Sequence, residues 1–298
     1  MTISEGYMPF KGYKTYYRKA GETQEGKCPL LLLHGGPGST HNYFEVLDPL
    51  AYSGRAVISY DQLGCGNSMV EGHPELWTPE TWLDELDCLI RHLGLSHFHL
   101  LGQSWGGMLC IYYLIERKGI GVKSAILSST LSSSRLWASE QHRLIGFMTD
   151  EEQKAIADAE ERNDFSGSDY AKANERFMHL HCAGEVTEDS PECLRRPKRA
   201  GTEAYLYGWG PNEYNPTGTL AQFDYTDRLC EIQVPCLVVS GTNDLCTPLI
   251  AKTLYDGIPH ARWELFEGAR HMPFVEQTER YCQMLDAWFE RTEREGTL

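Results

Sequence analysis

The chain has 298 residues, of which 41% are hydrophobic and 23% are charged, and its formal net charge at pH 7 is −15. This composition is ordinary for a globular protein, and the length suits one large domain, or one domain with a substantial insertion. The strong negative charge argues against nucleic acid or an anionic membrane surface as the main partner.

Ten cysteines are scattered along the chain without a Cys-x-x-Cys pair or a spacing typical of metal ligands. The first residues lack the basic start and apolar core of a signal peptide, and no apolar run is long enough to span a membrane. These features favour a cytoplasmic protein with free thiols. His179 and His181 form a lone His-x-His, which we interpret as structural, so we expect neither a metal nor a cofactor.

The first part of the chain predicts strands that end in polar, glycine-rich loops. Weak alternation over residues 7–20 is consistent with an edge strand. The continuous apolar run 28–33 is typical of a strand buried on both faces, and it leads directly into the loop 34–38, which exposes backbone N–H groups. Another predicted strand, 56–60, ends in the glycine-punctuated turn 61–68.

A helix and then a sharp turn follow. Thr78 is a good helix cap, with Pro79 at the first helical position, and apolar residues then recur at helical spacing. The apolar run 98–103 predicts a buried strand that passes through a Gly-x-Ser-x-Gly turn into another helix. A serine on such a turn adopts a strained backbone that lifts its hydroxyl clear of the sheet. Ser104 is therefore the candidate nucleophile.

Strands and helices continue to alternate on both sides of a long interruption. Further strands are predicted at 124–128, 234–241 and 262–266, and the last is followed by a helix over 273–291. Alternation of this kind predicts an α/β fold with a mostly parallel, doubly wound sheet.

The interruption contains amphipathic, charged segments and no convincing strand. We expect residues 131–225 to form an inserted all-helical cap, and residues 1–130 and 226–298 to form the core. The cap is expected to cover the carboxyl ends of the strands, where open α/β sheets bind ligands. Its aromatic residues are candidates for the pocket lining, among them Trp137, Tyr207 and Trp209.

Three residues have the identity and order of a catalytic triad. Serine becomes an effective nucleophile when a base takes its proton and a carboxylate orients that base. Asp244 and His271 each come directly after a predicted strand. With Ser104 they follow the order Ser…Asp…His, which is the order expected for an α/β-hydrolase.

The developing oxyanion needs preorganised N–H donors. We expect one from Trp105, which follows the nucleophile, and one from Gly36 in the glycine-rich loop. His34, at the start of that loop, is expected to fix the loop rather than to act as a second acid–base group. Cys65 and Cys246 lie near the predicted mouth of the site and are interpreted as bystander thiols.

Four motifs occur in order along the chain: His34-Gly-Gly-Pro-Gly38, Asp61-Gln-x-Gly-x-Gly-x-Ser68, Gly102-x-Ser-Trp-Gly-Gly107 and Gly210-Pro-Asn-Glu213. With these motifs the chain resembles the proline iminopeptidase family of α/β-hydrolases over nearly its whole length. The resemblance implies a serine hydrolase that releases an N-terminal residue, or cleaves an amide, of a small substrate with a free α-amine. It implies an acyl-enzyme on Ser104, and it implies that Glu213 binds the amine.

Two positions depart from the family pattern. Leu245 stands where a second carboxylate commonly follows the triad aspartate, and Leu63 stands where an arginine is often found. We expect Leu245 to place apolar surface beside the amine and so to weaken the preference for a free amine. The alternative is an esterase, thioesterase or amidase acting on another small metabolite, and less favoured is a non-catalytic ligand-binding receptor. The expected partner is a small peptide, amide or ester, and the oligomeric state stays open.

Overall fold

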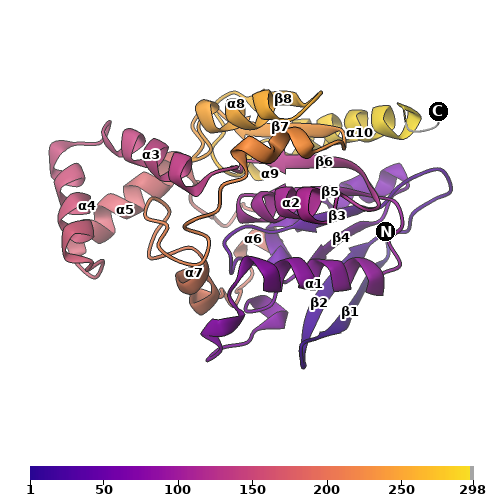
Figure 1. Cartoon of the computed structure of the whole chain (residues 1–298), viewed down its shortest axis with the longest axis horizontal. Coiled ribbons are helices and arrows are strands. Elements are labelled where there is room, and N and C mark those ends of the chain that lie inside the picture. Colours follow the sequence, from indigo (N-terminus) through magenta and orange to yellow (C-terminus); the bar gives the residue numbers. More distant parts are fainter. Residues whose placement is uncertain (296–298) are drawn as a thin grey trace.

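A computed structural model describes residues 1–295, and its centre is a sheet of eight strands in the order β1-β2-β4-β3-β5-β6-β7-β8 (Figure 1). Strands β3 to β8 pair in parallel, whereas β1 and β2 pair in antiparallel fashion with each other, as β2 does with β4. The mostly parallel sheet is therefore confirmed. The strands are β1 (Ile3–Phe10), β2 (Tyr13–Ala20), β3 (Leu30–Leu33), β4 (Val57–Tyr60), β5 (Phe98–Gln103), β6 (Val122–Ser128), β7 (Cys236–Gly241) and β8 (Arg262–Phe266).

The single edge strand predicted over residues 7–20 is wrong, because the chain reverses in the middle of that stretch. Lys11 and Gly12 have φ angles of 45° and 85°, so they form a tight turn between β1 and β2. The strand at the edge of the sheet is β1, and β2 lies between β1 and β4.

Both faces of the sheet are covered, as the short apolar strands predict. Alternate residues of β3 enter two different hydrophobic clusters: Leu31 and Leu33 face one, and Leu30 and Leu32 face the other. All four side chains are at most 1% exposed. The first cluster includes side chains of α1 (Pro79–His92), α2 (Trp105–Glu116) and α8 (Pro248–Gly257), and the second those of η1 (His41–Ser53), α9 (Pro273–Glu276) and α10 (Thr278–Glu295).

The helix predicted after Thr78 is α1, and the Thr78 side chain accepts a hydrogen bond from the backbone N–H of Thr81 at its start. The closing helix predicted over 273–291 is divided into α9 and α10 at Gln277. No helix in the described part of the chain is long and apolar enough to cross a membrane. Short 3₁₀ turns complete the core: η2 (Gly66–Ser68), η3 (Pro74–Leu76) and η4 (Thr226–Glu231).

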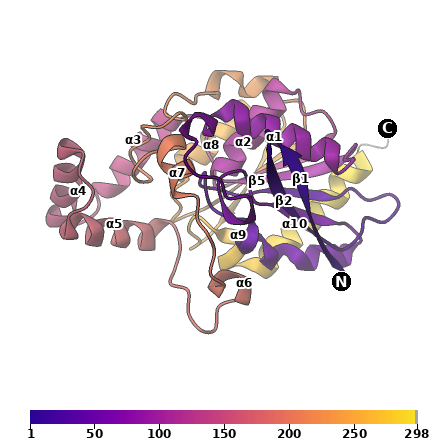
Figure 2. The ribbon, with the colours of Figure 1, turned by 90° about the horizontal axis from the view of Figure 1, so that it is seen from below.

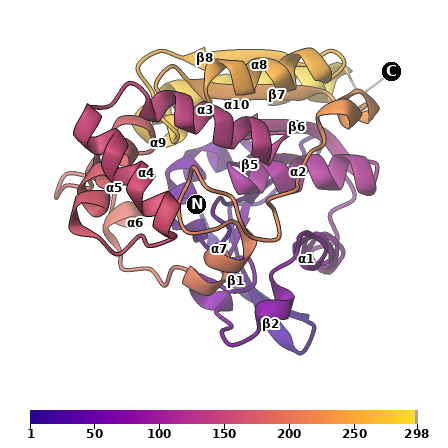
Figure 3. The ribbon, with the colours of Figure 1, turned by 60° about the vertical axis from the view of Figure 1, so that its left-hand side comes forward.

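The segment between β6 and β7 is helical. Within its described residues the β-pairing is limited to a single bridge between Ser133 and Asp224. Helices α4 and α5 lie side by side at the end of the molecule opposite the two termini (Figures 1 and 2), and they come forward in Figure 3. The helices are α3 (Ser134–Ile145), α4 (Asp150–Arg162), α5 (Ser168–His181), α6 (Glu192–Arg195) and α7 (Thr202–Gly208).

Helix α2 starts so close to the sheet that two positions beside its first turn have no room for a side chain. A Cβ atom on Gly102 would lie 2.1 Å from the carbonyl oxygen of Gly106. A Cβ atom on Gly106 would lie 2.0 Å from the carbonyl oxygen of Leu33. Because the obstructing atoms belong to the backbone, they cannot move aside as a flexible side chain would.

We expect the Gly106→Ala substitution to destabilise the fold by about 3 kcal/mol or more, because α2 must move away from β3. In a chain of this size such a loss lowers the melting temperature by roughly 6 °C or more. Calorimetry measures this change. Gly167→Ala is the control: the added Cβ meets nothing within 4 Å, and we expect a change within about 1 kcal/mol. Equal stability of the two variants would contradict the predicted clash.

Candidate active site

Ser104 lies on the turn between β5 and α2 in a strained backbone conformation. Its φ and ψ angles are 55° and −124°, which a residue with a side chain rarely adopts. Hydrogen bonds on both sides hold it there: its N–H donates to the carbonyl oxygen of Ser128 at 3.0 Å, and its own carbonyl oxygen accepts from Thr130 Oγ1 at 2.6 Å and from the N–H of Gly107 at 2.9 Å. The Ser104 side chain consequently lines a cavity of about 310 Å³.

His271 lines the same cavity and is bonded to Asp244. The distance from His271 Nδ1 to Asp244 Oδ1 is 2.7 Å. Asp244 Oδ1 also accepts from the N–H of Cys246 at 2.8 Å. Asp244 Oδ2 accepts from Ser129 Oγ at 2.6 Å and from the N–H of Gly241 at 3.1 Å. These donors fix the carboxylate so that it can orient the imidazole.

The end of α5 holds the loops that carry Asp244 and His271. The N–H of His271 donates to the carbonyl oxygens of His181 and Cys182, both at 3.1 Å. The His181 ring lies 3.0 Å from the carbonyl oxygen of Asn243, through Nδ1. His181 therefore holds these two loops through its carbonyl oxygen and its ring. This agrees with the interpretation of His181 as a structural residue.

Gly36 and Trp105 both border the small recess beside Ser104, and Gly36 also lines the cavity. Gly36 has a φ angle of 114°, which favours glycine, and its N–H has no hydrogen-bond partner among residues 1–295. Trp105 is the first residue of α2, so its N–H has no acceptor within the helix. Both N–H groups are free to bind a developing oxyanion.

Gln62 connects the two elements that supply these N–H groups. Its Oε1 accepts from Trp105 Nε1 at 2.7 Å, and its Nε2 donates to the carbonyl oxygen of His34 at 2.8 Å. The Gln62 N–H donates to His34 Nε2 at 3.0 Å, while His34 Nδ1 donates to the carbonyl oxygen of Gly35 at 2.9 Å. His34 is fully buried, and burial lowers its pKa to about 4. His34 thus fixes the loop, as the sequence predicts.

Glu85, on α1, holds the residue that follows Gln62, and no cation of the described chain lies beside its carboxyl group. Its Oε1 and Oε2 accept from the N–H of Leu63 at 2.9 and 3.1 Å, and Oε1 also accepts from the hydroxyl of Thr15. Burial raises the pKa of Glu85 to about 7, and the nearby charge of Asp61 adds to that rise. The Leu63 side chain packs in the hydrophobic core, so it contributes no charge here.

Glu213 belongs to the segment between β6 and β7 and lines the cavity. Its Oε1 accepts from the hydroxyl of Tyr205 at 2.8 Å, and its carbonyl oxygen accepts from Trp137 Nε1 at 2.8 Å. Burial raises the pKa of Glu213, an effect partly opposed by His271 and Tyr205. The carboxylate can accept further hydrogen bonds from a ligand, because Tyr205 is its one protein donor among the described residues.

A small recess of about 10 Å³ adjoins the cavity on its inner side. Ser104, Gly36 and Glu213 border both spaces, and the rest of the recess is apolar or aromatic. Two of the candidate aromatic residues, Trp137 and Trp209, line it. Tyr207 is 51% exposed and borders neither the recess nor the cavity.

Leu245 does not occupy the position that its place in the sequence suggests. Its side chain is fully buried in the main hydrophobic cluster and does not line the cavity. Its carbonyl oxygen accepts from Gln141 Nε2 at 2.7 Å, and its N–H donates to the carbonyl oxygen of His181. The expectation that Leu245 places apolar surface beside the amine is therefore wrong. Cys65 and Cys246 are also fully buried.

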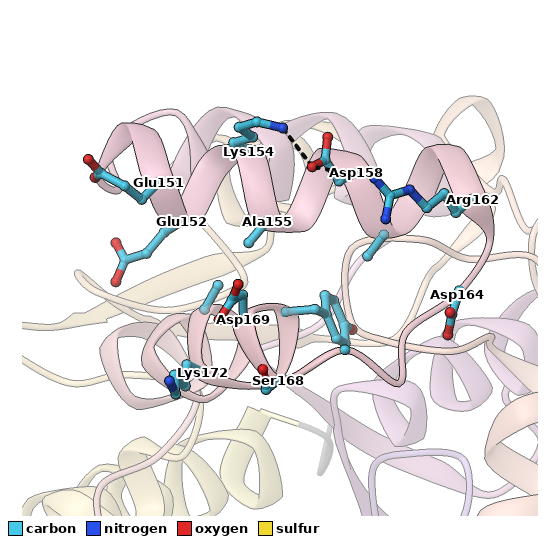
Figure 4. A pocket seen from close by; sticks show the side chains of 14 residues that line it. Glu151, Glu152, Lys154, Ala155, Asp158, Arg162, Asp164, Ser168, Asp169 and Lys172 are labelled. Atoms are coloured by element: carbon cyan, nitrogen blue, oxygen red, sulfur yellow. Dashed lines mark hydrogen bonds and ion pairs between the residues drawn. The ribbon is translucent and has the colours of Figure 1, made fainter.

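A cavity of about 680 Å³, larger than the one beside Ser104, lies between α4 and α5, away from these residues (Figure 4). Charged side chains surround it, and Lys154 pairs with Asp158 on its rim. Neither Ser104 nor His271 borders it, so its size does not make it the site of the chemistry.

Two groups have the side-chain types of metal ligands, and each contains a ligand atom that already bonds to the protein. In the first, Glu293 Oε1 accepts from Arg55 at 2.9 Å. In the second, His34 Nε2 accepts from the N–H of Gln62 at 3.0 Å. The members are Cys28, His99 and Glu293 in the first group, and His34, Asp61 and Cys65 in the second.

Comparison with known proteins agrees with this site. Residues 29–278 match the family model described as "alpha/beta hydrolase fold". A proline iminopeptidase of Clostridioides difficile (strain 630) is 65% identical over 97% of this chain and 98% of its own length. The chain belongs to the proline iminopeptidase family. It is thus a serine hydrolase of the aminopeptidase type.

Solved structures show the same relationship. The crystal structure of proline iminopeptidase from Mycobacterium smegmatis has a TM-score of 0.87 and 30% identity, and the match covers 98% of this chain and all of that one. The crystal structure of VinJ has a TM-score of 0.88 and 32% identity, with coverage of 97% and 99%. The resemblance inferred from the motifs is confirmed, and so is the α/β-hydrolase fold.

Several residues of the site gave no recognisable signal in the sequence. Tyr205 supports Glu213, Ser129 supports Asp244, and both Cys182 and Lys198 line the cavity. Each belongs to an ordinary surface or helix pattern, and its contacts are visible only in the folded chain. Gln62 was part of a family motif, but its role as a link between two loops was not predicted.

We expect Glu85 to make the protein less stable as pH rises. Between pH 4.5 and about 7 the unfolded carboxyl loses its proton while the buried one keeps it, so the free energy of unfolding falls. The total effect is about 3 kcal/mol, complete above pH 7 and absent below pH 4.5.

Denaturant unfolding of Glu85→Gln at pH 5 and pH 8 measures this effect. The variant should lose about 2 to 3 kcal/mol less than the parent over that interval, because the uncharged amide has no proton to lose. Glu267→Gln, which changes an exposed glutamate, is the matched control and should follow the parent. Parallel pH dependence of all three proteins would show that Glu85 does not ionise in this range.

Proposed function

We propose that this enzyme releases an N-terminal proline from short peptides, with Ser104 as nucleophile, His271 as base and Asp244 as the orienting acid. The observation that supports this most is the position of Glu213, a carboxylate that borders the cavity beside Ser104. A substrate whose free amine contacts Glu213 brings the carbonyl carbon of its first residue to the serine. Such a site favours removal of one residue from the amino end.

The proposed reaction has two halves. Ser104 Oγ attacks the carbonyl carbon as His271 takes its proton, and the N–H groups of Gly36 and Trp105 bind the oxyanion. The tetrahedral intermediate collapses, His271 returns the proton to the leaving amine, and an acyl-enzyme on Ser104 remains. Water, activated by His271, then attacks the acyl-enzyme and releases the first residue.

The chemistry around Glu213 suits proline in particular. A prolyl ammonium carries two N–H donors, one fewer than the ammonium of other residues, so one carboxylate leaves fewer donors unsatisfied. The ring of proline is apolar, and the inner recess beside Ser104 is lined by Trp137 and Trp209. The recess itself holds no more than about one water molecule. The proline ring therefore sits at the mouth of the recess, against these indoles.

The remaining parts of the proposal concern the cap and the cell compartment. We infer that residues 131–225 act as a cap, which supplies Glu213, Tyr205 and the carbonyl groups that hold His271. All ten cysteines are free, and this favours a cytoplasmic location. A small peptide is the proposed partner, and an ester or amide of another metabolite is the alternative that the substrate tests below would reveal.

We expect Ser104→Ala, His271→Ala and Asp244→Asn each to lower kcat by about a thousandfold or more, because the three groups act as a unit. The measurement is steady-state hydrolysis of a prolyl anilide, with circular dichroism to verify folding. Asp227→Asn is the matched control, since Asp227 does not line the cavity and should leave kcat unchanged. Activity of Asp244→Asn within a few-fold of the parent would disprove the assignment of the acid.

We expect Glu213→Gln to lower kcat/KM for free-amine substrates by about ten- to a hundredfold, the worth of one charge-assisted hydrogen bond. Matched substrates, each with a free amine or an N-acetyl group, measure this. Hydrolysis of the acetylated substrates should not change. Tyr205→Phe removes the donor that holds Glu213 and should act in the same direction with a smaller loss. Equal losses of kcat/KM on both substrate types would mean that Glu213 has a structural role. They would favour the alternative hypothesis of an esterase or amidase.

A further inference from the structure

The cavity beside Ser104 is lined by two side chains of opposite charge, Glu213 and Lys198. They lie in different parts of the site. Glu213 borders both the cavity and the inner recess, whereas Lys198 borders only the outer cavity. Ser104 and Gly36 border both spaces, so Glu213 accompanies the nucleophile in the recess, and the ammonium group of Lys198 does not.

The segment that carries Lys198 is fixed to the loops around the oxyanion donor. The N–H of Gly201 donates to the carbonyl oxygen of Gly38 at 2.7 Å. The N–H of Gly66 donates to the carbonyl oxygen of Arg199 at 2.8 Å. Lys198 directly precedes Arg199, so the backbone that carries it is held at one side by these two contacts with the core.

Lys198 differs from the other basic residues of its segment in having no protein partner. Arg196 Nη1 pairs with Glu45 Oε1 at 3.0 Å, and Arg199 pairs with Glu71 at 2.7 Å. Arg195 Nε donates to the carbonyl oxygen of Ser190. Among residues 1–295 the Lys198 side chain has neither an ion pair nor a hydrogen bond. The chain has a net charge of −15, which repels an anionic ligand. The unpaired ammonium group of Lys198 offsets this repulsion at the cavity.

We propose that Lys198 binds the α-carboxylate of the leaving amino acid, so that the enzyme prefers dipeptides over longer or C-terminally blocked substrates. This inference rests on the proposed function. In a dipeptide the scissile carbonyl lies between the free ammonium and the free carboxylate. Ser104 and both charged side chains line the cavity, and only Lys198 stays out of the recess that Glu213 shares with Ser104. In longer peptides the carboxylate is farther from the serine and no longer meets Lys198.

The test compares prolyl-glycine with prolyl-glycinamide, which differ in the α-carboxylate. The ratio of their kcat/KM values in Lys198→Met is divided by the same ratio in the parent, which cancels the different reactivity of the two leaving groups. We expect this double ratio to be about one fifth, because the variant loses one partly exposed ion pair to the carboxylate. The loss should appear as a higher KM for prolyl-glycine. Lys198→Glu should lower the double ratio further, Lys198→Arg should preserve the parent's ratio, and added salt should weaken the parent's preference.

Two variants serve as matched controls. Lys172→Met removes a charge from α5, beside the distant cavity (Figure 4), and Arg195→Met removes one from the same basic segment without touching the cavity. Both should keep the parent's ratio. An unchanged ratio in Lys198→Met, or an equal fall in Arg195→Met, would overturn the assignment of Lys198.

The source of the carboxylate and the proposed function are tested separately. Prolyl-glutamic acid α-amide carries only a side-chain carboxylate. A larger effect of Lys198→Met on that substrate than on prolyl-glycine would overturn the α-carboxylate assignment. Prolyl anilide has no carboxylate and measures basal activity. If the parent cleaves none of these prolyl substrates, the proposed function itself fails. Normal cleavage of the anilide with an unchanged ratio removes only the role of Lys198.

Discussion

The close approach of α2 to the sheet is the constraint on which the rest of the site depends. The backbone at Gly106 lies against the carbonyl oxygen of Leu33 at the end of β3, so the helix must begin directly where β5 ends. Ser104 has no extended linker to relax into, and its φ angle of 55° follows from that geometry. The same contact places the start of α2 next to the loop after β3, which brings the N–H groups of Trp105 and Gly36 to the same serine.

Hydrogen bonds and ring contacts connect the segment between β6 and β7 with the loops that carry Asp244 and His271. The last carbonyl groups of α5 accept from the N–H groups of His271 and Leu245, and the ring of Trp137 packs edge-on against His271 at 5.7 Å. Trp137 also donates to the carbonyl oxygen of Glu213. The position of the His271 imidazole therefore depends on contacts from the segment between β6 and β7.

The sequence was sufficient for features that depend on local patterns, and insufficient for those that depend on long-range contacts. Buried strands, the turn at Ser104 and the loops after β7 and β8 all follow from periodicity and glycine placement. The hairpin of β1 and β2 was missed because weak alternation continues through the turn at Lys11. Leu245 was misplaced because adjacency to Asp244 says nothing about which way a side chain points. The bond from Tyr205 to Glu213 joins two cap elements whose arrangement no single-sequence pattern specifies.

Three carboxyl groups show how surroundings, rather than residue type, set what each can do. Asp244 accepts from a ring nitrogen, a hydroxyl and two backbone N–H groups, so its orientation is fixed and it holds the imidazole. Glu213 has one protein donor and an open side toward the cavity, so it is available to a ligand. Glu85 is enclosed, has only neutral donors, and has a pKa raised to about 7. Its ionisation at neutral pH would strengthen the bond to the N–H of Leu63 while adding a buried charge, so the carboxyl that holds the loop after β4 also lowers the stability of the fold as pH rises.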